Sequence, residues 1–415
     1  MSEAAQNIAR PARNLGTLDF WQTAILWLLV ASGFFVVQEP APYELVFLIA
    51  FVLFLPVGMR IPRATLPLVI FLILYNMGGA FSLIGTPEDP IARRFVTVSF
   101  YMAITGVFFC FIVAEDPLKR MATIRHAYVI AAVIGAITGI IGYFGYFGMG
   151  AAWAPVWRAQ GTFKDPNVLS TFLIPAFIFL AQDLLIGKAR RRLVASGALL
   201  IVTFGILLAF SRGAWGNVML ASLLLVVLTF VLSPSPALRN RILVLSLAGA
   251  IVLAAIVAIA LSIPEVQRIF EIRASLAQSY DVGETGRFGN QIASIPMILT
   301  EPNGMSPRHF HFVFGADPHN VYLNAFASYG WLGGISFVTL VITSFWAGWR
   351  AIVSRTPWQH HALAVYCPLV ATLLQAVQID IDHWRHFYLL LGLNWGLFAA
   401  SLAWETRQRA RAAGR

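Results

Sequence analysis

Long apolar runs, separated by short segments with Gly, Pro and charged residues, recur along the whole sequence. Each run is roughly 17 to 22 residues long, which as an α-helix is enough to cross the ~30 Å hydrocarbon core of a bilayer. The pattern predicts twelve transmembrane helices and therefore puts both termini on the same side. The predicted spans are residues 20–37, 42–58, 64–84, 95–114, 127–147, 167–186, 193–210, 214–232, 242–262, 319–341, 361–378 and 387–404.

The composition is that of a membrane protein. Hydrophobic residues make up 59% of the 415 residues, charged residues only 12%, and the mean hydropathy is +0.75. Soluble domains are about 45–50% apolar and about 25% charged. The sequence therefore predicts an all-α integral membrane protein in which residues 1–415 form a single polytopic membrane domain. The first apolar run has no small-residue cleavage site and is expected to be retained as a helix.

The Lys and Arg residues are divided unevenly between the two sides of the predicted bundle. Most of the 29, including KARRR at 188–192 and RQRARAAGR at 407–415, fall on the side that holds both termini. Positively charged loops stay in the cytoplasm, so this side is predicted to be cytoplasmic. The net charge of +10 is explained by attraction of these clusters to anionic lipid headgroups, and no nucleic-acid partner is expected.

Two of the predicted outer loops are long. Residues 148–166 are rich in Gly, Trp and Pro, and residues 263–318, between predicted helices 9 and 10, form a large periplasmic loop. Within it, EVQRIFEIRASLAQSY (265–280) and RFGNQIASIPMILTEPNG (287–304) have apolar residues at helical spacing and are predicted to be short amphipathic helices on the membrane surface. Charges are nearly absent from the spans, so polar chemistry is expected at the outer surface rather than along a pathway through the bilayer.

Chemically useful residues gather in four outer segments. They are RAQGTFKDPN (158–167), FSRGAWG (210–216), GETGRFGNQ (283–291) and DPHNVYLNAFASYGWLGG (317–334). Each places Arg, Lys or His beside Gly or Pro, and all are predicted at the same membrane surface. A single Arg at a helix end usually extends to lipid headgroups, so it is the grouping of these residues that indicates a site.

Arg212 and Arg287 are the first candidates for binding an anion. Arg212 lies in a tight SRG turn between aromatic Phe210 and Trp215, and Arg287 follows the turn GETG and precedes a predicted helix start. Glycine lets the backbone approach a ligand closely, and the N–H groups at a helix start favour anions. Cations grouped at a low-dielectric boundary repel one another unless an anion joins them. A diphosphate has suitable charge, and Arg binds phosphate in a planar, bidentate fork.

His319 is a candidate general base at the start of a predicted transmembrane helix. Imidazole titrates near neutral pH, which suits the abstraction of a proton. The next residue, Asn320, either orients a substrate or caps the helix. The alternative for the whole DPHN segment is a simple turn with His319 as a surface cap, and the arginines predicted on the same face favour the functional interpretation.

The other outer His and Asp residues are of the types that ligate zinc. They occur in two separate loops and without an HExxH pattern, as His309 and His311 and as Asp380, Asp382, His383 and His386. A metal is therefore not expected. Asp382, His383 and Arg385 are expected to line the acceptor side of the site or to pair with one another.

Together these motifs resemble the O-antigen ligase and O-antigen polymerase superfamily of bacterial envelope glycosyltransferases. Members are similar in their number of helices, in a large outer loop that carries an Arg, and in a His followed by Asn at the start of the next helix. The matching segments are RAQGTFKDPN (158–167), SRG (211–213), RFGNQ with the following PMILTEPNG (287–304), and HNVYLNAFASYGWLGG (319–334).

The resemblance implies a GT-C-like fold and a donor oligosaccharide linked to a polyprenyl diphosphate such as undecaprenyl diphosphate. The glycan is expected to pass, with inversion at the anomeric carbon, to an acceptor hydroxyl on the periplasmic side of the bacterial inner membrane. By match of residue type, His319 is the base and Arg212 and Arg287 hold the diphosphate, with Arg158 and Lys164 as further candidates for that role. No metal, no other cofactor and no soluble nucleotide sugar are expected.

Three acceptors fit the resemblance: a growing polysaccharide, lipid A core, or a protein hydroxyl. The first two are preferred, because protein-glycosylating relatives often carry an extra soluble C-terminal region and this sequence stops soon after its last predicted helix. The main alternative function is a transporter or flippase for lipid-linked glycans, which predicts charges at the membrane centre and two related halves; the sequence shows neither. An envelope scaffold would explain the helices but not the grouped Arg and His residues.

Overall fold

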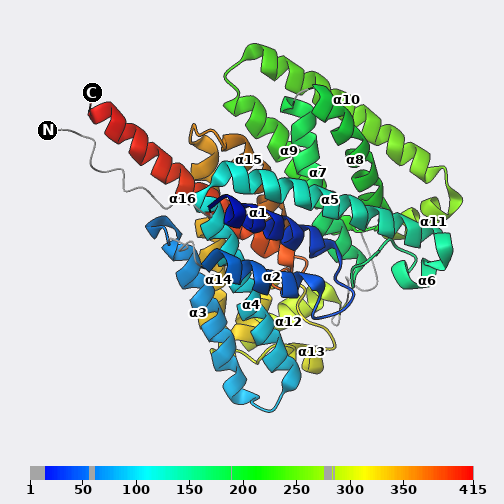
Figure 1. The fold of residues 1–415 in the computed structure, drawn as a ribbon. Coiled ribbons are helices and arrows are strands. Elements are labelled where there is room, and N and C mark those ends of the chain that lie inside the picture. Colours follow the sequence, from blue (N-terminus) through cyan, green and yellow to red (C-terminus); the bar gives the residue numbers. More distant parts are fainter. Residues whose placement is uncertain (1–14, 56–60, 188, 275–282, 284–285, 415) are drawn as a thin grey trace.

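The computed structural model describes residues 15–55, 61–187, 189–274, 283 and 286–414, and every regular element in this part of the chain is a helix. Figure 1 shows the helices packed into a bundle from which the C-terminal α16 projects at one end. The α-helices are α1 (Leu15–Ala31), α2 (Pro42–Phe54), α3 (Leu66–Ser82), α4 (Pro90–Glu115), α5 (Pro117–Phe144), α6 (Gly150–Trp153), α7 (Pro166–Ile186), α8 (Ala189–Leu208), α9 (Arg212–Leu232), α10 (Pro236–Leu261), α11 (Pro264–Ala274), α12 (Arg287–Thr300), α13 (His309–Phe314), α14 (Val321–Val353), α15 (Gln359–Gln375) and α16 (Arg385–Ala413).

Each predicted apolar run falls on one of these helices. Within the described residues, nine helices are long and apolar enough to cross a membrane: α1, α3, α4, α5, α7, α9, α10, α14 and α16. Of the other three predicted spans, α2 and α8 are apolar but shorter by this measure, and α15 has 17 residues. The chain is therefore a multi-pass membrane protein, while the total of twelve crossings and the GT-C-like fold stay predictions.

The long outer loop contains the two helices that its periodicity predicts. α11 covers the start of the first segment, whose last residues lie outside the described part of the chain, and α12 begins at Arg287 as predicted. α13 was not predicted, because HFHFVF is too short for a helical period to be distinguished from a turn.

Several helices begin with a capping side chain followed by proline. The Asp89 carboxylate accepts hydrogen bonds from the backbone N–H groups of the first turn of α4, and Asp116 and Asp165 cap α5 and α7 in the same way. Proline follows each cap at the first helical position, where its missing N–H is not needed. These three DP pairs thus mark helix starts, and one of them, at 165–166, belongs to the site described below.

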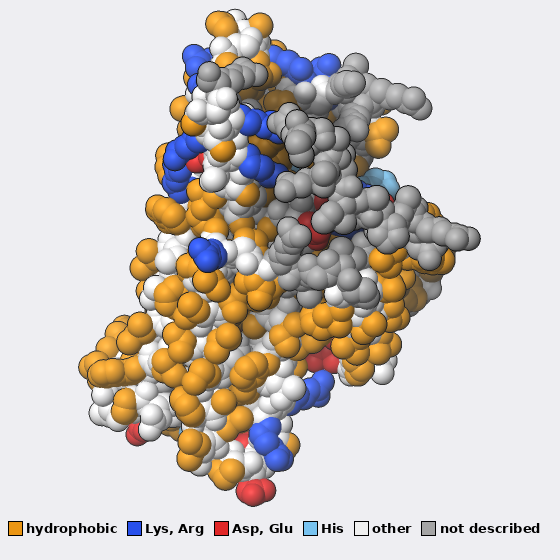
Figure 2. Space-filling model, turned by 60° about the vertical axis from the view of Figure 1, so that its left-hand side comes forward, with side chains coloured by type: hydrophobic (Ala, Val, Ile, Leu, Met, Phe, Trp, Pro, Cys, Tyr) orange, Lys and Arg blue, Asp and Glu red, His pale blue; other side chains and the backbone are white. Residues whose placement is uncertain are grey.

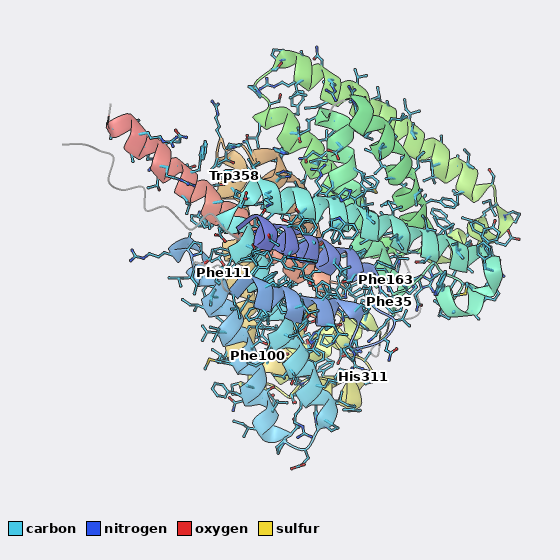
Figure 3. All side chains as sticks on the ribbon, viewed as in Figure 1. Phe35, Phe100, Phe111, Phe163, His311 and Trp358 are labelled. Atoms are coloured by element: carbon cyan, nitrogen blue, oxygen red, sulfur yellow. The ribbon has the colours of Figure 1, made fainter. Side chains whose placement is uncertain are left out.

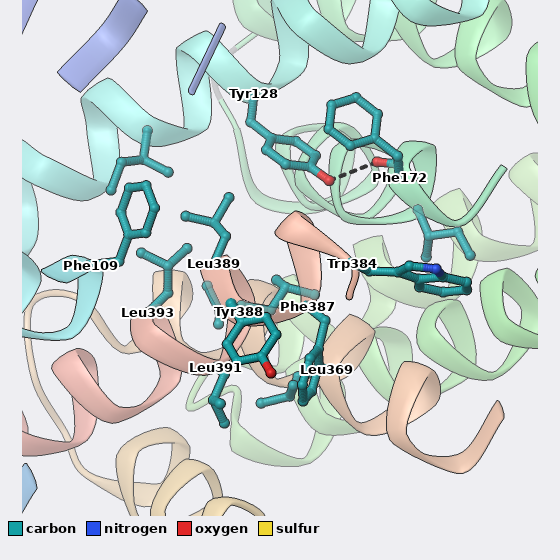
Figure 4. Packing of buried hydrophobic residues seen from close by; sticks show 14 of the residues in the cluster. Phe109, Tyr128, Phe172, Leu369, Trp384, Phe387, Tyr388, Leu389, Leu391 and Leu393 are labelled. Carbon is teal, nitrogen blue, oxygen red and sulfur yellow. Dashed lines mark hydrogen bonds between the residues drawn. The ribbon is translucent and has the colours of Figure 1, made fainter. Parts of the chain in front are cut away.

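The centre of the bundle is formed by α14 and α16, packed against α3 and α4. A Cβ added to Gly78 of α3 would lie 2.6 Å from the backbone N of Gly333 in α14, and one added to Gly392 of α16 would lie 2.3 Å from the carbonyl oxygen of Gly106 in α4. Small residues allow membrane helices to approach this closely. Figure 4 shows the large buried side chains around α16, with the Tyr128 hydroxyl donating to the Phe172 carbonyl at 2.8 Å.

The surface is divided between apolar and charged regions. Hydrophobic side chains cover most of the middle of the face in Figure 2, and charged side chains gather toward its ends. The helices differ greatly in how far they are enclosed: 83% of the most apolar stretch of α16 is buried, against 6% for α10. α10 therefore presents almost its whole circumference outward, as expected of a helix at the lipid boundary.

Candidate active site

Arg212 is the first residue of α9 and is held by a strained turn. The preceding Phe210 is buried and has a positive φ of 46°, a conformation that costs a non-glycine residue of order 1–3 kcal/mol. Ser211 caps the helix, its hydroxyl accepting from the N–H of Ala214 at 3.4 Å. The turn therefore fixes the guanidinium at the positive end of the α9 dipole.

Arg287 occupies the equivalent position in α12, directly after Gly286. Two amide side chains of the first turns hold this helix in place: Asn290 donates to the carbonyl of Ala316 at 3.2 Å, and Gln291 donates to the carbonyl of Val377 at 3.2 Å. The helix that carries Arg287 is thus tied both to the segment before His319 and to the turn after α15.

Arg158 joins the same region from the loop between α6 and α7. Its side chain is buried, with Nε donating to the carbonyl of Ala209 at 2.8 Å and an Nη2 donating to Oδ1 of Asn167 at 2.9 Å. Arg158 therefore connects the end of α8 with the start of α7, and at least part of its hydrogen-bonding capacity serves the fold.

These three arginines line one cavity of about 450 Å³, a volume within the range of ligand pockets. Its lining is Arg158, Asn167, Phe210, Ser211, Arg212, Gly213, Arg273, Arg287, Phe288, Gln375, Gln378 and Ile379. Of these described residues four are Arg and none is Asp or Glu. The first turns of α7, α9 and α12 all reach the cavity, and helix N-termini favour anions. The arrangement is suited to a ligand with more than one negative charge.

Sequence reasoning missed two contributions to this lining. Arg273, at the end of α11, was given no role, although it lies in the segment EVQRIFEIRASLAQSY that was predicted to be helical. Gln375 and Gln378, at the end of α15, gave no signal in the sequence, since glutamine at a helix end is common and their approach to Arg212 is purely tertiary.

His319 lies next to this cavity. The backbone just after it is bonded to the turn that follows α15, and this turn forms one wall of the cavity. Val321, two residues on, donates its backbone N–H to the carbonyl of Ala376 at 3.0 Å, and the adjacent Val377 carbonyl receives the Gln291 amide of the Arg287 helix. The guanidinium of Arg287 is close enough to affect the titration of the imidazole. The fold therefore brings Arg212 and Arg287 to one cavity and the helix of Arg287 to the segment that carries His319.

The imidazole of His319 has the protonation state that a base needs. The side chain is 46% exposed, and its partial burial lowers its pKa most. The positive charge of Arg287 lowers the pKa further, Asp317 acts in the opposite direction, and Arg308 and His311 add to the lowering. The ring is therefore neutral at neutral pH. Its backbone has a positive φ of 51°, which is uncommon outside glycine and is found at functional sites.

Asp380 is the carboxylate nearest to this ring in the described structure, and it was given no role by the sequence. Its Oδ2 lies 4.0 Å from Nδ1 of His319. Burial raises its pKa well above the usual range, and the charges of Asp382 and Asp317 raise it further. Asp317 forms an ion pair with Arg308 at 2.7 Å. The His319 side chain thus lies between a cationic region on the cavity side and an acidic one on the other.

Of the two roles predicted for Asn320, the structure shows the helix cap. Its Oδ1 accepts from the backbone N–H groups of Tyr322 at 3.0 Å and Leu323 at 3.2 Å, and so caps α14. The cap fixes the end of the helix directly after His319. A substrate contact from the same side chain stays a prediction.

A broken turn in α14 positions the helical segment that follows His319. Gly330 has φ 67° and ψ −170°, and the loop after α12 enters the break. Met305 donates its N–H to the carbonyl of Ala327 at 2.7 Å, and Trp331 donates its N–H to the carbonyl of Pro302 at 2.8 Å. The loop therefore satisfies backbone groups that the break would leave unpaired, and it joins the helix of Arg287 to that of His319.

The remaining predicted site residues lie outside the cavity lining. Lys164 contacts a carboxylate oxygen of Glu39 at 2.7 Å, and Nε of Arg385 donates to Glu44 at 2.7 Å. Asp382 is buried and pairs with His383, its Oδ2 lying 3.1 Å from Nδ1 of that ring. Of the predicted pairings among Asp382, His383 and Arg385, the structure thus shows only the first, and their place on the acceptor side stays a prediction.

The outer histidines do not form a metal site in the part of the chain that is described. No group of three or more His, Cys, Asp or Glu side chains there is arranged to hold a metal ion. Figure 3 labels His311, on α13, toward the end of the bundle opposite to Trp358 at the start of α15.

The comparisons with known proteins agree with the sequence motifs. Residues 197–338 match the protein-family model described as O-antigen ligase. The matched segment contains α9, α12 and the first half of α14, and with them Arg212, Arg287 and His319. No curated protein matches the chain. The predicted resemblance to the O-antigen ligase and polymerase superfamily is confirmed.

Proposed function

Because residues 197–338 match the O-antigen ligase family model, we propose that this chain transfers an oligosaccharide from a polyprenyl diphosphate to an acceptor hydroxyl at the periplasmic face of the bacterial inner membrane. The observation that carries the proposal is the cavity with four arginines and three helix N-termini, next to a neutral imidazole. A diphosphate carries the charge that such a lining is suited to bind.

The chemistry is a displacement at the anomeric carbon. The acceptor oxygen attacks that carbon, the bond from the carbon to the diphosphate oxygen breaks, and the electron pair leaves with the lipid diphosphate, so the configuration is inverted. His319 accepts the proton of the acceptor hydroxyl. Arg212 and Arg287 stabilise the negative charge that develops on the departing diphosphate, a role worth most in a fixed, water-poor site.

The surroundings of His319 support its role as base. A histidine is efficient when its pKa lies near or below the working pH and its ring is oriented. Partial burial and Arg287 keep the ring neutral, and the Asp380 carboxyl, whose Oδ2 lies 4.0 Å from Nδ1 of His319, is placed to orient the ring. Asp380 is thus a positioning residue in this proposal rather than a group that touches the substrate.

The proposed partners follow from this chemistry. The donor is an undecaprenyl-diphosphate-linked glycan, and the acceptor is either another glycan chain or lipid A core, so the protein acts in polysaccharide polymerisation or O-antigen ligation, within lipopolysaccharide or exopolysaccharide biosynthesis. The reaction uses neither a metal nor a nucleotide sugar. Both termini are cytoplasmic in this topology, and membrane lipids surround the bundle.

The test is to incubate the purified protein in lipid nanodiscs with an undecaprenyl-diphosphate oligosaccharide and an acceptor. A transferase releases undecaprenyl diphosphate and extends the acceptor, whereas a transporter or flippase leaves the glycosyl linkage intact. Glycan analysis of a deletion strain then separates the acceptors: loss of long polymer with single units retained indicates a polymerase, and accumulation of finished polymer on the lipid carrier indicates a ligase.

His319→Ala should abolish glycan transfer while the protein stays folded, because positioned general bases contribute ~10² to 10⁴-fold to rate. The matched control is His126→Ala in α5, where Nδ1 of the ring accepts the Trp27 indole N–H at 2.9 Å. Full activity in the His319 variant would remove the base from the proposal.

A further inference from the structure

α12 has its polarity reversed relative to a helix of a soluble protein. Its buried side chains are Asn290 and Ser294, whereas four large apolar side chains on the opposite face are between 49% and 69% exposed. These are Phe288, Ile292, Ile295 and Leu299. Their spacing of four, three and four residues puts them in one stripe along the helix. A stripe of this kind marks a surface that contacts a hydrocarbon rather than water.

The orientation of this stripe is fixed by the polar side of the helix. The Asn290 and Gln291 amides bind the carbonyls of Ala316 and Val377, and the Trp331 indole N–H donates to the carbonyl of Ile298 at 2.8 Å. These bonds lie at both ends of α12 and prevent its rotation about its own axis. These hydrogen bonds therefore keep the apolar face of α12 pointing outward.

The stripe begins where the arginine cavity ends. Phe288 lines that cavity together with Arg287, and it is also the first residue of the stripe. From Phe288 to Leu299 the stripe extends roughly 16 Å at 1.5 Å per residue, the length of a few isoprene units. A cationic cavity and an apolar track thus meet within one helical turn, which matches an amphiphile with an anionic diphosphate head and a hydrocarbon tail.

We propose that the outward face of α12 holds the first isoprene units of the donor's polyprenyl chain while the cavity holds its diphosphate. This rests on the proposed function and adds to it a site for the lipid. Fixing the chain at the point where it leaves the diphosphate orients the leaving group toward the arginines. The stripe from Phe288 to Leu299 orients the chain more than it increases affinity, because membrane lipid is as apolar as this helix face.

The test compares two donors that carry the same glycan diphosphate, one on undecaprenol and one on a two-isoprene alcohol. Leu299→Ser should lower kcat/KM for the undecaprenyl donor by about tenfold, because a chain that is held less well misplaces the leaving group, and it should leave kcat/KM for the short donor unchanged. Phe288→Ser, at the cavity end, should raise KM for both donors.

The matched control is Leu247→Ser on α10, a leucine of nearly equal exposure on a mostly exposed helix that contributes no residue to the cavity lining. It should affect both donors equally. If Leu299→Ser behaves like this control, bulk lipid covers the stripe and the track is refuted. Wild-type turnover of both donors establishes the proposed function independently, and no turnover of either donor would refute that function instead.

Discussion

The outer cations of this protein fall into two regions that the fold treats differently. The cavity has four arginines in its described lining and neither Asp nor Glu. In the second region the chain itself supplies the carboxylates: Lys164 and Arg94 contact Glu39 at 2.7 and 3.1 Å, and Arg385 contacts Glu44. Basic residues on the same predicted face thus have two roles. Some bind loops together, and the others line the cavity.

Glu39 illustrates what the second region does. Burial alone would raise the pKa of its carboxyl, yet the hydrogen bond and charge of Lys164, with the charges of Arg385 and Arg94, lower it overall. The carboxylate and its cations stabilise one another's charged forms. Such pairs join the 35–44 segment to the loop before α7 and to α4, and they are therefore structural.

The largest expected effect comes from changing the cavity arginines. Arg212→Ala and Arg287→Ala should each lower kcat/KM for the lipid-linked donor by ~10²-fold or more, the scale of lost charge stabilisation at a transition state. Lys164→Met is the matched control from the second region, and it should leave donor turnover within a factor of a few. Equal losses in all three variants would erase the distinction between the regions.

A smaller effect is expected when the connection between the Arg287 and His319 helices is disturbed. An Ala side chain at Gly330 would put its Cβ 2.5 Å from the carbonyl oxygen of Pro302, in a backbone conformation that only glycine adopts readily. Gly330→Ala should therefore displace the loop and lower kcat by about 10 to 10²-fold, since small misplacements of reacting groups are costly.

The control for strain alone is Gly145→Ala, where φ is 69° and nothing lies within 4 Å of the added Cβ. It should reduce thermal stability without changing kcat of the folded fraction. The positioning role of Gly330 fails if both variants lose stability to the same degree and retain the same kcat per folded molecule.

The smallest effect is a change in pH dependence. Burial and then the charge of Arg287 lower the pKa of His319 below its usual 6.5, so the imidazole becomes the active base at a pH below that value. In Arg287→Gln one cause of the lowering is removed, and the acid limb of kcat/KM should move to higher pH. Asp317, Arg308, His311 and Asp380 also face the ring and are left in place. An unchanged acid limb would show that Arg287 does not act on the base.

Much of the fold could be predicted from the sequence, because each transmembrane helix is specified locally. Apolar runs of membrane length located the spans, and the DP pairs before α5 and α7 show why those helices begin where they do. α13 escaped prediction because six residues are too few to show a period. The break at Gly330 was not predicted for another reason. The loop that fills it comes from residues 301–305, and no local sequence pattern indicates that contact.

The site was predictable in part. Arg212, Arg287 and His319 stood out because each lies beside Gly or Pro at a helix start, and the cavity unites the two arginines. Lys164 also lies near a Pro and Arg385 also lies at a helix start, and only the fold shows that Glu39 and Glu44 reach them. Asp380 was one of two aspartates in QIDID, and the approach of its carboxylate to His319 depends on how α15 ends against α14.

The most direct test of the account is an experimental structure of the protein in nanodiscs with undecaprenyl diphosphate bound. The account predicts both phosphates in the 450 Å³ cavity, in contact with the guanidinium groups of Arg212 and Arg287, and the His319 imidazole on the side of the cavity nearest to Asp380. Density for the diphosphate at Lys164 or Arg385 instead, or a His319 ring on the opposite leaflet, would contradict it.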